Sequence, residues 1–486
     1  NITNITNEIQ IITESDIKSV ENIPEYAIKE NQTVLFLSIE QQQVARRILE
    51  NNENLFITGA AGTGKSVLLK YVVRELKRAL GDDAVGVTAS TGIAAVNIGG
   101  KTLHNFAGLI LAKDKSGSMT MKSFRSASLK KRWNEVSVLV IDEISMVHPD
   151  IFEKLDYLAR SIRRNSRPFG GIQLVLFGDF LQLPPVGSRS FCFESSVWDR
   201  AGLSGPGTVQ LRTILRHKDD LAFAELLEKV RLGRGTPDVL ETLNSCWVAV
   251  KPEPDDGILA TKLYCTNRDV DSENTGRLKE LKAPSVIIPA VDVWQSSALN
   301  PKKKKDLLEK IEKVIPSSIE LRKGAQVVLL RNRALSSSTT SSGTSTALPL
   351  SNGSRGVVVG FERRTGSEFS QIPVVKFDDG QVVAVPPCDW SPGSNISSSE
   401  SETALTGGLT RKQIPLKLAW ALTVHKSQGL TLTRAKLSLA KTFDYGQAYT
   451  ALSRVTGMKG LWLADPVQAK NIQANPSVLK YYGITQ

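Results

Sequence analysis

The chain is poor in cysteine. Its 486 residues include four, Cys192, Cys246, Cys265 and Cys388, which lie far apart and form no C-x-x-C pair. Closely spaced cysteines are the usual ligands of structural zinc and the usual framework of small disulfide-rich secreted domains. The pattern therefore argues against a zinc site and favours reduced thiols in a cytosolic or nuclear protein.

Long apolar runs and repeats are also missing. No run approaches the roughly 20 residues that a membrane-spanning helix needs, although 41% of the residues are hydrophobic, which supports globular folding. No repeat of long period is visible. The chain starts at Asn1 and not at a methionine, so we expect a fragment from which a targeting segment can be missing.

Acidic residues are fewer than basic residues in this chain. Asp and Glu number 49 against 61 Lys and Arg, a net charge of +12, and such an excess favours a polyanionic partner. A membrane surface is the alternative, which we disfavour because no basic amphipathic helix stands isolated near an end of the chain. The length exceeds that of one ordinary core, so we expect two to four domains.

A glycine-rich segment carries the clearest chemical signal. Residues 59–66 fit the pattern G-x-x-x-x-G-K-[ST], with an apolar run before and an apolar helical run after. This order predicts a strand, a phosphate-binding loop and a helix; a structural turn is the alternative that Lys65, Ser66 and both flanks argue against. Backbone N–H groups would close on a triphosphate, Lys65 would place its charge at the β- and γ-phosphates, and the Ser66 hydroxyl would hold Mg²⁺. The predicted loop residues are Gly59, Ala60, Ala61, Gly62, Thr63, Gly64, Lys65 and Ser66.

Two carboxylates end a second apolar run. Residues 138–141 read as a strand buried on both faces, and Asp142 and Glu143 follow it. Ligands of open α/β sheets bind at the carboxyl ends of the strands. Asp142 is predicted to hold Mg²⁺ through water, and Glu143 to orient and deprotonate the attacking water. A solvated strand end is the alternative for an isolated acid pair.

Further candidates surround this predicted site. Asp179 and Gln182 follow another buried strand; Gln182 suits a γ-phosphate sensor or a water-positioning role, or else a turn hydrogen bond. Arg216 and Arg454 lie in the second α/β segment, where a guanidinium could neutralise γ-phosphate charge when two lobes close. For either arginine alone, a surface salt bridge is the commoner explanation.

Polar and aromatic residues at other strand ends suit a phosphodiester backbone. Residues 423–429 follow a strand and mix hydrogen-bond donors with glycine, although His425 could equally be a buried imidazole. Phe106 could stack on a base or belong to the core. Arg160, Arg163, Arg164 and Arg167 mark either a solvated basic helix face or one positioned against nucleic acid. The nucleic-acid contacts predicted from these segments are Thr91, His104, Phe106, Thr423, His425, Lys426 and Ser427.

The chain divides by composition into several segments. Residues 1–37 read as an arm, and Ser38 and Gln41 form a capping box that starts a helix. Strands at 55–58, 85–88, 138–141 and 173–177 alternate with helices, which predicts a doubly wound α/β domain. A second α/β pattern starts near Val209 and resumes at 416–423. Between its parts, strands at 327–330, 356–359 and 373–385, the last with a turn at Asp379-Gly380, predict a small barrel. Residues 336–346 and 391–408 are predicted to be loops.

Together these segments resemble a superfamily 1 helicase of class B, in the RecD-like branch. Residues 153–171, between the acid pair and Gly178-Asp179, resemble the signature segment of the Pif helicases, and the likeness covers nearly everything from Leu37 to Pro466. The resemblance implies two RecA-like lobes, 38–200 and 201–320 with 411–486. It also implies a wedge subdomain at about 107–134 and an SH3-like subdomain at 321–410. Residues 1–37 and 336–346 match no element of the family.

The resemblance also assigns roles. Gln41 belongs to the adenine-reading motif, Gln182 to the motif that couples nucleotide to DNA, and Arg216 and Arg454 to the arginine-finger positions. Residues 425–429, ending at the phosphate-linked Gly429, and the region 447–457 fall in strand-contacting and phosphate-linked motifs. The resemblance thereby implies three more nucleic-acid contacts, Gln447, Thr450 and Ser453. The family is an ATP- and Mg²⁺-dependent 5′-to-3′ helicase on single-stranded DNA and DNA junctions. It is also active on G-quadruplexes, RNA–DNA hybrids and telomere ends.

We therefore expect an ATP-driven DNA motor. Its expected setting is the nucleus and the mitochondrion, away from membranes, and its expected state is a monomer, with self-association on DNA as the alternative. A P-loop kinase or GTPase is the rival enzyme, which the arginine-bearing second lobe and the +12 charge argue against. A single-strand-binding protein with a vestigial nucleotide site is the rival from another class, which the set Lys65, Asp142 and Glu143 argues against.

Overall fold

The computed structural model divides the chain into two compact units. The first comprises residues 1–253 and 431–486, and the second residues 254–430. The structure describes residues 11–12, 27–30, 33–108, 127–215, 220–253, 260–294, 300–312, 315–330, 354–364, 368–377, 380–390, 409–428, 432 and 434–484.

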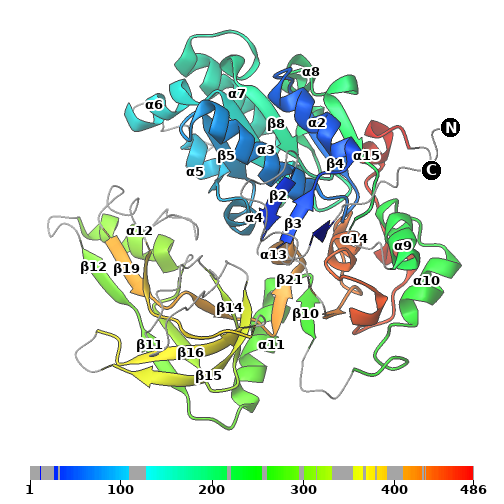
Figure 1. Ribbon diagram of the computed structural model, residues 1–486. Helices are drawn as coiled ribbons and strands as arrows, with labels where there is room; N and C mark the ends of the chain where they lie inside the picture. Colours follow the sequence, from blue (N-terminus) through cyan, green and yellow to red (C-terminus); the bar gives the residue numbers. More distant parts are fainter. Residues whose placement is uncertain are drawn as a thin grey trace. The chain divides into compact units, whose positions relative to one another are not determined.

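A six-stranded parallel sheet is the framework of the first unit (Figure 1). Its strands run in the order β6-β5-β7-β8-β4-β9, and every neighbouring pair is parallel. The four strands predicted from the sequence are present, each within one residue of its predicted end. The strands are β4 (Leu55–Gly59), β5 (Val85–Ala89), β6 (Lys101–Thr102), β7 (Val138–Asp142), β8 (Gln173–Phe177) and β9 (Thr208–Leu211).

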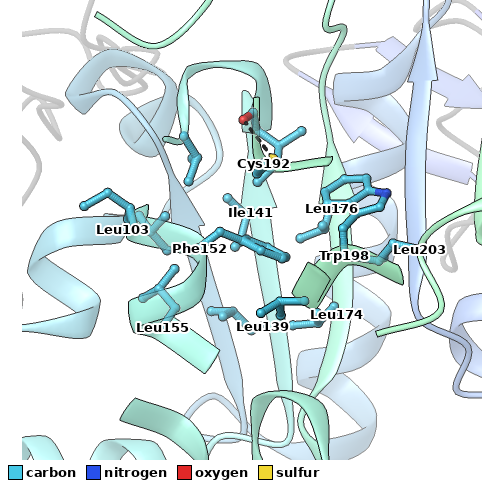
Figure 2. Close-up of a cluster of buried hydrophobic side chains, with 14 of the residues drawn as sticks. Leu103, Leu139, Ile141, Phe152, Leu155, Leu174, Leu176, Cys192, Trp198 and Leu203 are labelled. Carbon is cyan, nitrogen blue, oxygen red and sulfur yellow. Dashed lines mark hydrogen bonds between the residues drawn. The ribbon is translucent and has the colours of Figure 1, made fainter. Parts of the chain in front are cut away.

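Helices cover both faces of this sheet, because alternate side chains of each buried strand point to opposite sides. Val138 and Val140 of β7 pack with helices α2, α3 and α4, and Leu139 and Ile141 pack on the other face with α5, α6, α7 and α8. Figure 2 shows the second cluster, in which Phe152 lies among the strand side chains. The helices are α2 (Ile39–Leu49), α3 (Lys65–Leu80), α4 (Gly92–Asn97), α5 (Leu103–Ala107), α6 (Ala127–Glu135), α7 (Pro149–Arg163) and α8 (Ser196–Arg200).

Local signals fix several helix ends. Ser38 caps α2, and both hydrogen bonds of its capping box with Gln41 are present, as predicted. Helix α7 starts with Pro149 at its first turn, where a missing N–H does no harm, and ends at Arg164 in the left-handed conformation. The boundaries of these two helices therefore agree with the capping residues in the sequence.

The arginine cluster at the end of α7 divides into two pairs: Arg160 and Arg163 make contacts within the protein, whereas Arg164 and Arg167 are exposed. Arg160 pairs with the buried Asp156 (2.9 Å). Arg163 donates to four backbone carbonyls, those of Gly170 (2.9 Å), Trp133 (2.9 Å), Asn134 (3.2 Å) and Val136 (2.8 Å). It thereby joins the end of α6 to the loop after α7. Neither alternative predicted for this cluster, a solvated face or a nucleic-acid face, describes these two side chains.

The rest of the first unit comes from the later part of the sequence. Strand β9 belongs to the first sheet beside β4, so the predicted lobe boundary at residue 200 falls before the last strand of that sheet. Helix α15 packs Val478 and Leu479 into the same core cluster as Leu139 and Ile141. The remaining elements are α9 (Leu221–Arg231), α10 (Pro237–Asn244), β22 (Ala435–Leu437), α14 (Gln447–Leu452), β23 (Leu461–Leu463) and α15 (Pro476–Tyr481), with β22 parallel to β23.

The predicted N-terminal arm contains regular structure. Strands β1 (Ile11–Ile12), β2 (Ala27–Glu30) and β3 (Thr33–Phe36) form an antiparallel sheet in the order β1-β3-β2. Most of the predicted wedge, residues 109–126, lies outside the described residues, as do the predicted loops 336–346 and 391–408.

The second unit combines one parallel strand pair with antiparallel sheets. Strand β10 (Thr261–Tyr264) pairs in parallel with β21 (Ala421–Thr423), beside α11 (Asn267–Glu280). A five-stranded sheet runs β17-β16-β15-β14-β20, and its hairpin turns at Gly380, while Asp379 lies outside the described residues. The predicted strand 416–423 is thus divided between two sheets. The other elements are β11 (Val286–Pro289), β12 (Val291–Trp294), α12 (Pro301–Glu312), β13 (Ser318–Leu321), β14 (Gln326–Leu329), β15 (Arg355–Arg363), β16 (Gln371–Phe377), β17 (Val382–Ala384), β18 (Cys388–Trp390), β19 (Leu409–Gln413), β20 (Leu416–Leu418) and α13 (Val424–Ser427).

Helices in the described part of the chain do not combine the length and the apolarity needed to cross a membrane.

Candidate nucleotide site

Three predicted motifs meet at one edge of the parallel sheet. The glycine-rich loop follows β4, the acid pair ends β7, and the segment with Asp179 and Gln182 follows β8; these three strands are neighbours in the order β7-β8-β4. Parallel strands place their carboxyl ends at the same edge, which is where α/β sheets bind ligands. The topology therefore brings the three motifs together.

The loop after β4 has the backbone of a phosphate-binding turn. Gly59, at φ 149°, lies so close to the Leu211 carbonyl that a Cβ would stand 2.6 Å from its oxygen. Gly64 adopts the left-handed conformation (φ 79°) as the N-cap of α3, where Gly is favoured because it has no Cβ. Lys65 folds back onto the loop, and its Nζ donates to the carbonyls of Gly59 (2.7 Å) and Ala60 (3.0 Å).

Electrostatics make this lysine easy to deprotonate. Burial lowers the pKa of Lys65 to about 8, although the charges of Asp179, Glu143 and Asp142 act in the opposite direction. A bound polyphosphate would bring negative charge to Lys65 and favour its protonated form.

Gln41 links helix α2 to the loop. Its Nε2 donates to the carbonyls of Thr63 (3.4 Å) and Gly64 (3.2 Å), while its Oε1 accepts the N–H of Ser38 (2.9 Å). The residue is 1% exposed. Gln41 thus holds the loop in this structure, and its contact with adenine stays a prediction.

The acid pair lies at the same sheet edge as the loop. Glu143 has a left-handed backbone (φ 52°), and its N–H donates to Oδ1 of Asp142 (2.9 Å). Burial and then the charge of Glu143 raise the pKa of Asp142, and Lys65 only partly offsets them. A cation beside Asp142 would therefore favour its ionised form. Mg²⁺ prefers oxygen ligands, and the exposed Ser66 hydroxyl and the Asp142 carboxylate are a donor set that fits it.

Asp179 is held by an arginine that the sequence did not reveal. The fully buried Asp179 carboxylate makes a bidentate pair with Arg231 of α9, at 2.9 and 3.0 Å. Burial alone would lower the pKa of Arg231, but the charge and hydrogen bonds of Asp179 outweigh it and raise that pKa well above its usual value. The pair connects the turn after β8 to α9. Asp179 therefore has a structural role, because both of its carboxylate oxygens bind Arg231.

Gln182 and Arg454 meet in the same region. Nη2 of Arg454 donates to Oε1 of Gln182 (3.4 Å) and to the Ser453 hydroxyl (2.8 Å), and Nε donates to the Thr450 carbonyl (3.0 Å). Both residues are 4% exposed. Burial lowers the pKa of Arg454, and the charge of Glu143 raises it. The structure therefore brings this predicted finger to the predicted sensor; Arg216 lies outside the described residues.

Helix α14, which precedes Arg454, also contacts the glycine-rich loop. The Ala61 N–H donates to the hydroxyl of Tyr449 (2.7 Å). Gly446, with φ 70°, lies so close to the turn after β8 that a methyl group there would overlap the carbonyl oxygens of Leu181 and Gln182. The sequence placed Tyr449 in the predicted region 447–457 but assigned this side chain no role of its own, because its contact with Ala61 joins residues 388 positions apart.

Several predicted nucleic-acid contacts are buried, which corrects the prediction for them in this structure. Phe106 is 5% exposed and packs edge-on against Trp133, so its ring is a core residue and cannot stack on a base. Gln447, Thr450 and Ser453 are fully buried in and after α14, beside the nucleotide motifs. The Ser453 hydroxyl accepts from Arg454 (2.8 Å), and Oε1 of Gln447 accepts the N–H of Phe443 (3.0 Å), while the Thr450 hydroxyl and Nε2 of Gln447 have no hydrogen-bond partner among the residues that the structure describes.

The other predicted contacts are placed as follows. In the first unit, Thr91 and His104 are half-buried; the Thr91 hydroxyl accepts the N–H of Ala94 (3.2 Å), and burial lowers the pKa of His104. In the second unit, Thr423 and Ser427 are buried, and His425 is half-buried. The Lys426 side chain and Gly429 lie outside the described part of the chain.

Comparison with known proteins agrees with this arrangement. A profile of the PIF1-like helicase family matches residues 36–238. The crystal structure of Pif1 helicase from Candida albicans superposes with a TM-score of 0.77, at 35% identity, over 92% of this chain and 99% of that one. The chain belongs to the PIF1-like helicase family.

Two further family members are similar to this chain. ATP-dependent DNA helicase PIF1 from Xenopus laevis is 40% identical over 458 residues, which are 92% of this chain and 64% of that protein. The chain thus spans a little under two thirds of that relative's length. The Bacteroides Pif1 helicase, solved in complex with ADP-AlF3 and ssDNA, superposes with a TM-score of 0.67 at 26% identity over 92% of this chain and 97% of that one. The α/β fold with parallel sheets is thus that of Pif1 helicases.

Proposed function

We propose that this chain is an ATP-dependent DNA helicase that moves along single-stranded DNA and separates duplexes. The observation that carries the proposal is the meeting of Gln182 and Arg454 beside the glycine-rich loop and the acid pair. An arginine delivered from a late segment of the chain to a phosphate site is the arrangement that couples hydrolysis to movement in P-loop motors. Family membership supports the same activity.

Each site residue has a chemical task under this proposal. Lys65 and the loop N–H groups bind the phosphates of ATP, and Ser66 and Asp142 hold Mg²⁺, which would neutralise charge on the β- and γ-oxygens. Glu143 accepts a proton from the attacking water. Gln182 positions that water, and Arg454 stabilises the transition-state charge. Arg216 is proposed as a second finger, and Gln41 and Gly429 as further nucleotide contacts.

DNA binding is proposed from charge, accessibility and family. The net charge of +12 suits a phosphate backbone, and Thr91, His104, His425 and Lys426 remain the candidate contacts. The structure of the Bacteroides relative contains ssDNA, which supports single-stranded DNA as the track. The lobes were predicted at 38–200 and at 201–320 with 411–486. Because β9 pairs with β4, we propose that residues 201–211 belong to the first lobe and that the second starts after them. A wedge at 107–134 is proposed to meet the duplex junction, and an SH3-like insert is proposed at 321–410.

The finer properties rest on the family resemblance. We infer 5′-to-3′ movement and activity on G-quadruplexes and RNA–DNA hybrids, with a part in genome and telomere maintenance. The proposed setting is the nucleus and the mitochondrion, and the proposed state is a monomer that can self-associate on DNA.

ATP turnover with and without single-stranded DNA tests the proposal. The wild-type chain should hydrolyse ATP, and DNA should stimulate it strongly. Lys65→Ala should abolish turnover but keep the fold and much of the DNA affinity, because the described Lys65 contacts are two loop carbonyls. Turnover that ignores DNA would favour a kinase or GTPase, and DNA binding without turnover would favour a passive single-strand-binding protein.

A further inference from the structure

A buried tyrosine occupies a backbone donor of the nucleotide loop. The Tyr449 hydroxyl accepts the Ala61 N–H at 2.7 Å, and the two residues are 2% and 9% exposed. Buried backbone N–H groups are almost always paired, so the tyrosine satisfies a donor next to the phosphate-binding backbone. The contact joins residues 388 positions apart in the sequence.

The phenol stays neutral and has room for one further partner. Burial and the charge of Asp179 raise the pKa of Tyr449 well above its usual value. A cavity of about 10 Å³ borders the ring, and Ala60, Ala61, Leu227 and Glu228 help to line it. A space of this size holds a single water at most. The hydroxyl accepts from Ala61, and its own proton is free to be donated to one further acceptor.

The same helix carries the arginine finger. Tyr449 lies in the middle of α14, Gly446 packs its start against the carbonyls of Leu181 and Gln182, and Arg454 follows its end and reaches Gln182. Helix α14 thus has two docking points on the nucleotide site, one on each of two neighbouring loops. A six-residue helix fixed at two points has little freedom to turn.

We propose that Tyr449 is a positioning residue for ATP hydrolysis, which fixes Arg454 relative to the glycine-rich loop through the Ala61 N–H. The inference rests on the proposed ATPase activity. When the loop keeps the conformation that presents this N–H, α14 is in place and Arg454 points to Gln182. When the loop changes, the hydrogen bond is lost and the arginine is released. Tyr449 therefore links the state of the loop to the finger without touching the substrate.

Tyr449→Phe tests this directly, because it removes one oxygen and keeps the ring. The matched control is Tyr481→Phe, which keeps the ring and removes a hydroxyl bonded to Trp198 (3.1 Å) and Thr208 (3.0 Å), neither of which belongs to the nucleotide motifs. Steady-state ATP turnover with saturating single-stranded DNA gives kcat, fluorescent ADP binding gives the nucleotide affinity, and thermal unfolding shows that each variant is folded.

We expect Tyr449→Phe to lower kcat about tenfold, the scale of one hydrogen bond to a group that acts in the transition state, and to change nucleotide Kd less than about twofold. Tyr481→Phe should leave kcat unchanged. In an Arg454→Ala background, Tyr449→Phe should have almost no further effect, because positioning an absent finger does nothing.

Three results separate the possible failures. A wild-type chain that does not hydrolyse ATP overturns the proposed function itself. An active wild type with an unchanged kcat in Tyr449→Phe overturns the tyrosine's role alone. Effects of Tyr449→Phe and Arg454→Ala that multiply also overturn it, because they would show that the tyrosine acts independently of the finger.

Discussion

Glu143 has a backbone conformation that glutamate seldom adopts. Its φ of 52° lies in the left-handed region, where a non-glycine residue is strained by on the order of 1–3 kcal/mol. Such strain persists where the surrounding structure enforces it, and it is common at functional sites. Here it turns the chain away from the strand direction just after Asp142. A glutamate kept in this conformation is consistent with the proposed role as the general base.

Glu143→Gln should separate nucleotide binding from hydrolysis. The amide keeps the shape of the side chain but cannot accept a proton from water, and general-base catalysis contributes roughly 10²–10⁴-fold. Turnover should fall by that factor, while fluorescent ADP should bind as it does to wild type. Lys65→Ala is the contrasting variant, since it should weaken nucleotide binding as well. Near-normal turnover in Glu143→Gln would remove Glu143 from the chemistry.

His104 should make folding stability depend on pH. Burial lowers the pKa of His104, so between that lowered pKa and the unfolded value near 6.5 the unfolded chain binds more protons than the folded one. Stability should therefore rise with pH across this window and be lower at pH 5 than at pH 7. Urea unfolding at both values should show a smaller difference for His104→Asn than for wild type. Equal differences in the two proteins would mean that His104 is solvated.

The packing of helix α14 against the nucleotide site depends on a single glycine at its start, Gly446. Gly446 has φ 70° and faces two carbonyls, whereas Gly202 has φ 71° and open space within 4 Å of where a Cβ would lie. Alanine is equally strained by the backbone at both positions. The two positions differ in the space around an added methyl group, which would meet the turn after β8 at Gly446 but no other atom of the described residues within 4 Å at Gly202.

Gly446→Ala should therefore be more harmful than Gly202→Ala. We expect Gly446→Ala to be destabilised by about 1–3 kcal/mol more than the control, the usual effect of overpacking. Its ATP turnover should fall, because α14 must move away from Gln182. Thermal unfolding and ATP turnover of the two variants check this. Equal stability and equal turnover would show that α14 is not held tightly against the turn.

The sequence predicted the positions of individual strands better than the neighbours of each strand in the fold. Short apolar runs in the sequence located β4, β5, β7 and β8, because the hydrophobic pattern of a strand and the residues that end it lie close together in the sequence. The place of β9 in the first sheet was not predicted, since a strand's neighbours are set by tertiary pairing. The Asp179–Arg231 pair, 52 residues apart, was missed for the same reason.

The resemblance predicted DNA contacts for polar residues in and just after α14, and the structure buries these side chains. Gln447, Thr450 and Ser453 recur at helical spacing, but they are buried around the finger. Periodicity shows that residues share a helix face. It does not show whether that face meets a ligand or another part of the protein. Phe106 illustrates the same ambiguity for aromatic residues.

At the scale of the whole molecule, the net charge is the property that bears on nucleic-acid binding. The buried side chains of Arg231 and Arg411 are engaged in ion pairs, Arg231 with Asp179 (2.9 Å) and Arg411 with Asp292 (2.7 Å) and Glu312 (2.5 Å). The whole chain carries a net charge of +12, which favours a polyanionic partner. Binding through phosphates releases counterions, so affinity for single-stranded DNA should fall steeply with salt and depend little on sequence. Titrations of a labelled oligonucleotide at several salt concentrations check this, and an affinity that salt leaves unchanged would contradict it.

Strand displacement on tailed duplexes tests the central claim most directly. One duplex carries a 5′ single-stranded tail and the other a 3′ tail, with ATP present and with Lys65→Ala as the inactive control. An ATP-driven motor of the proposed polarity opens the 5′-tailed duplex, leaves the 3′-tailed one closed, and loses all opening in Lys65→Ala. Opening of only the 3′-tailed duplex would contradict the polarity, and opening of neither by an ATP-hydrolysing wild type would contradict the helicase itself.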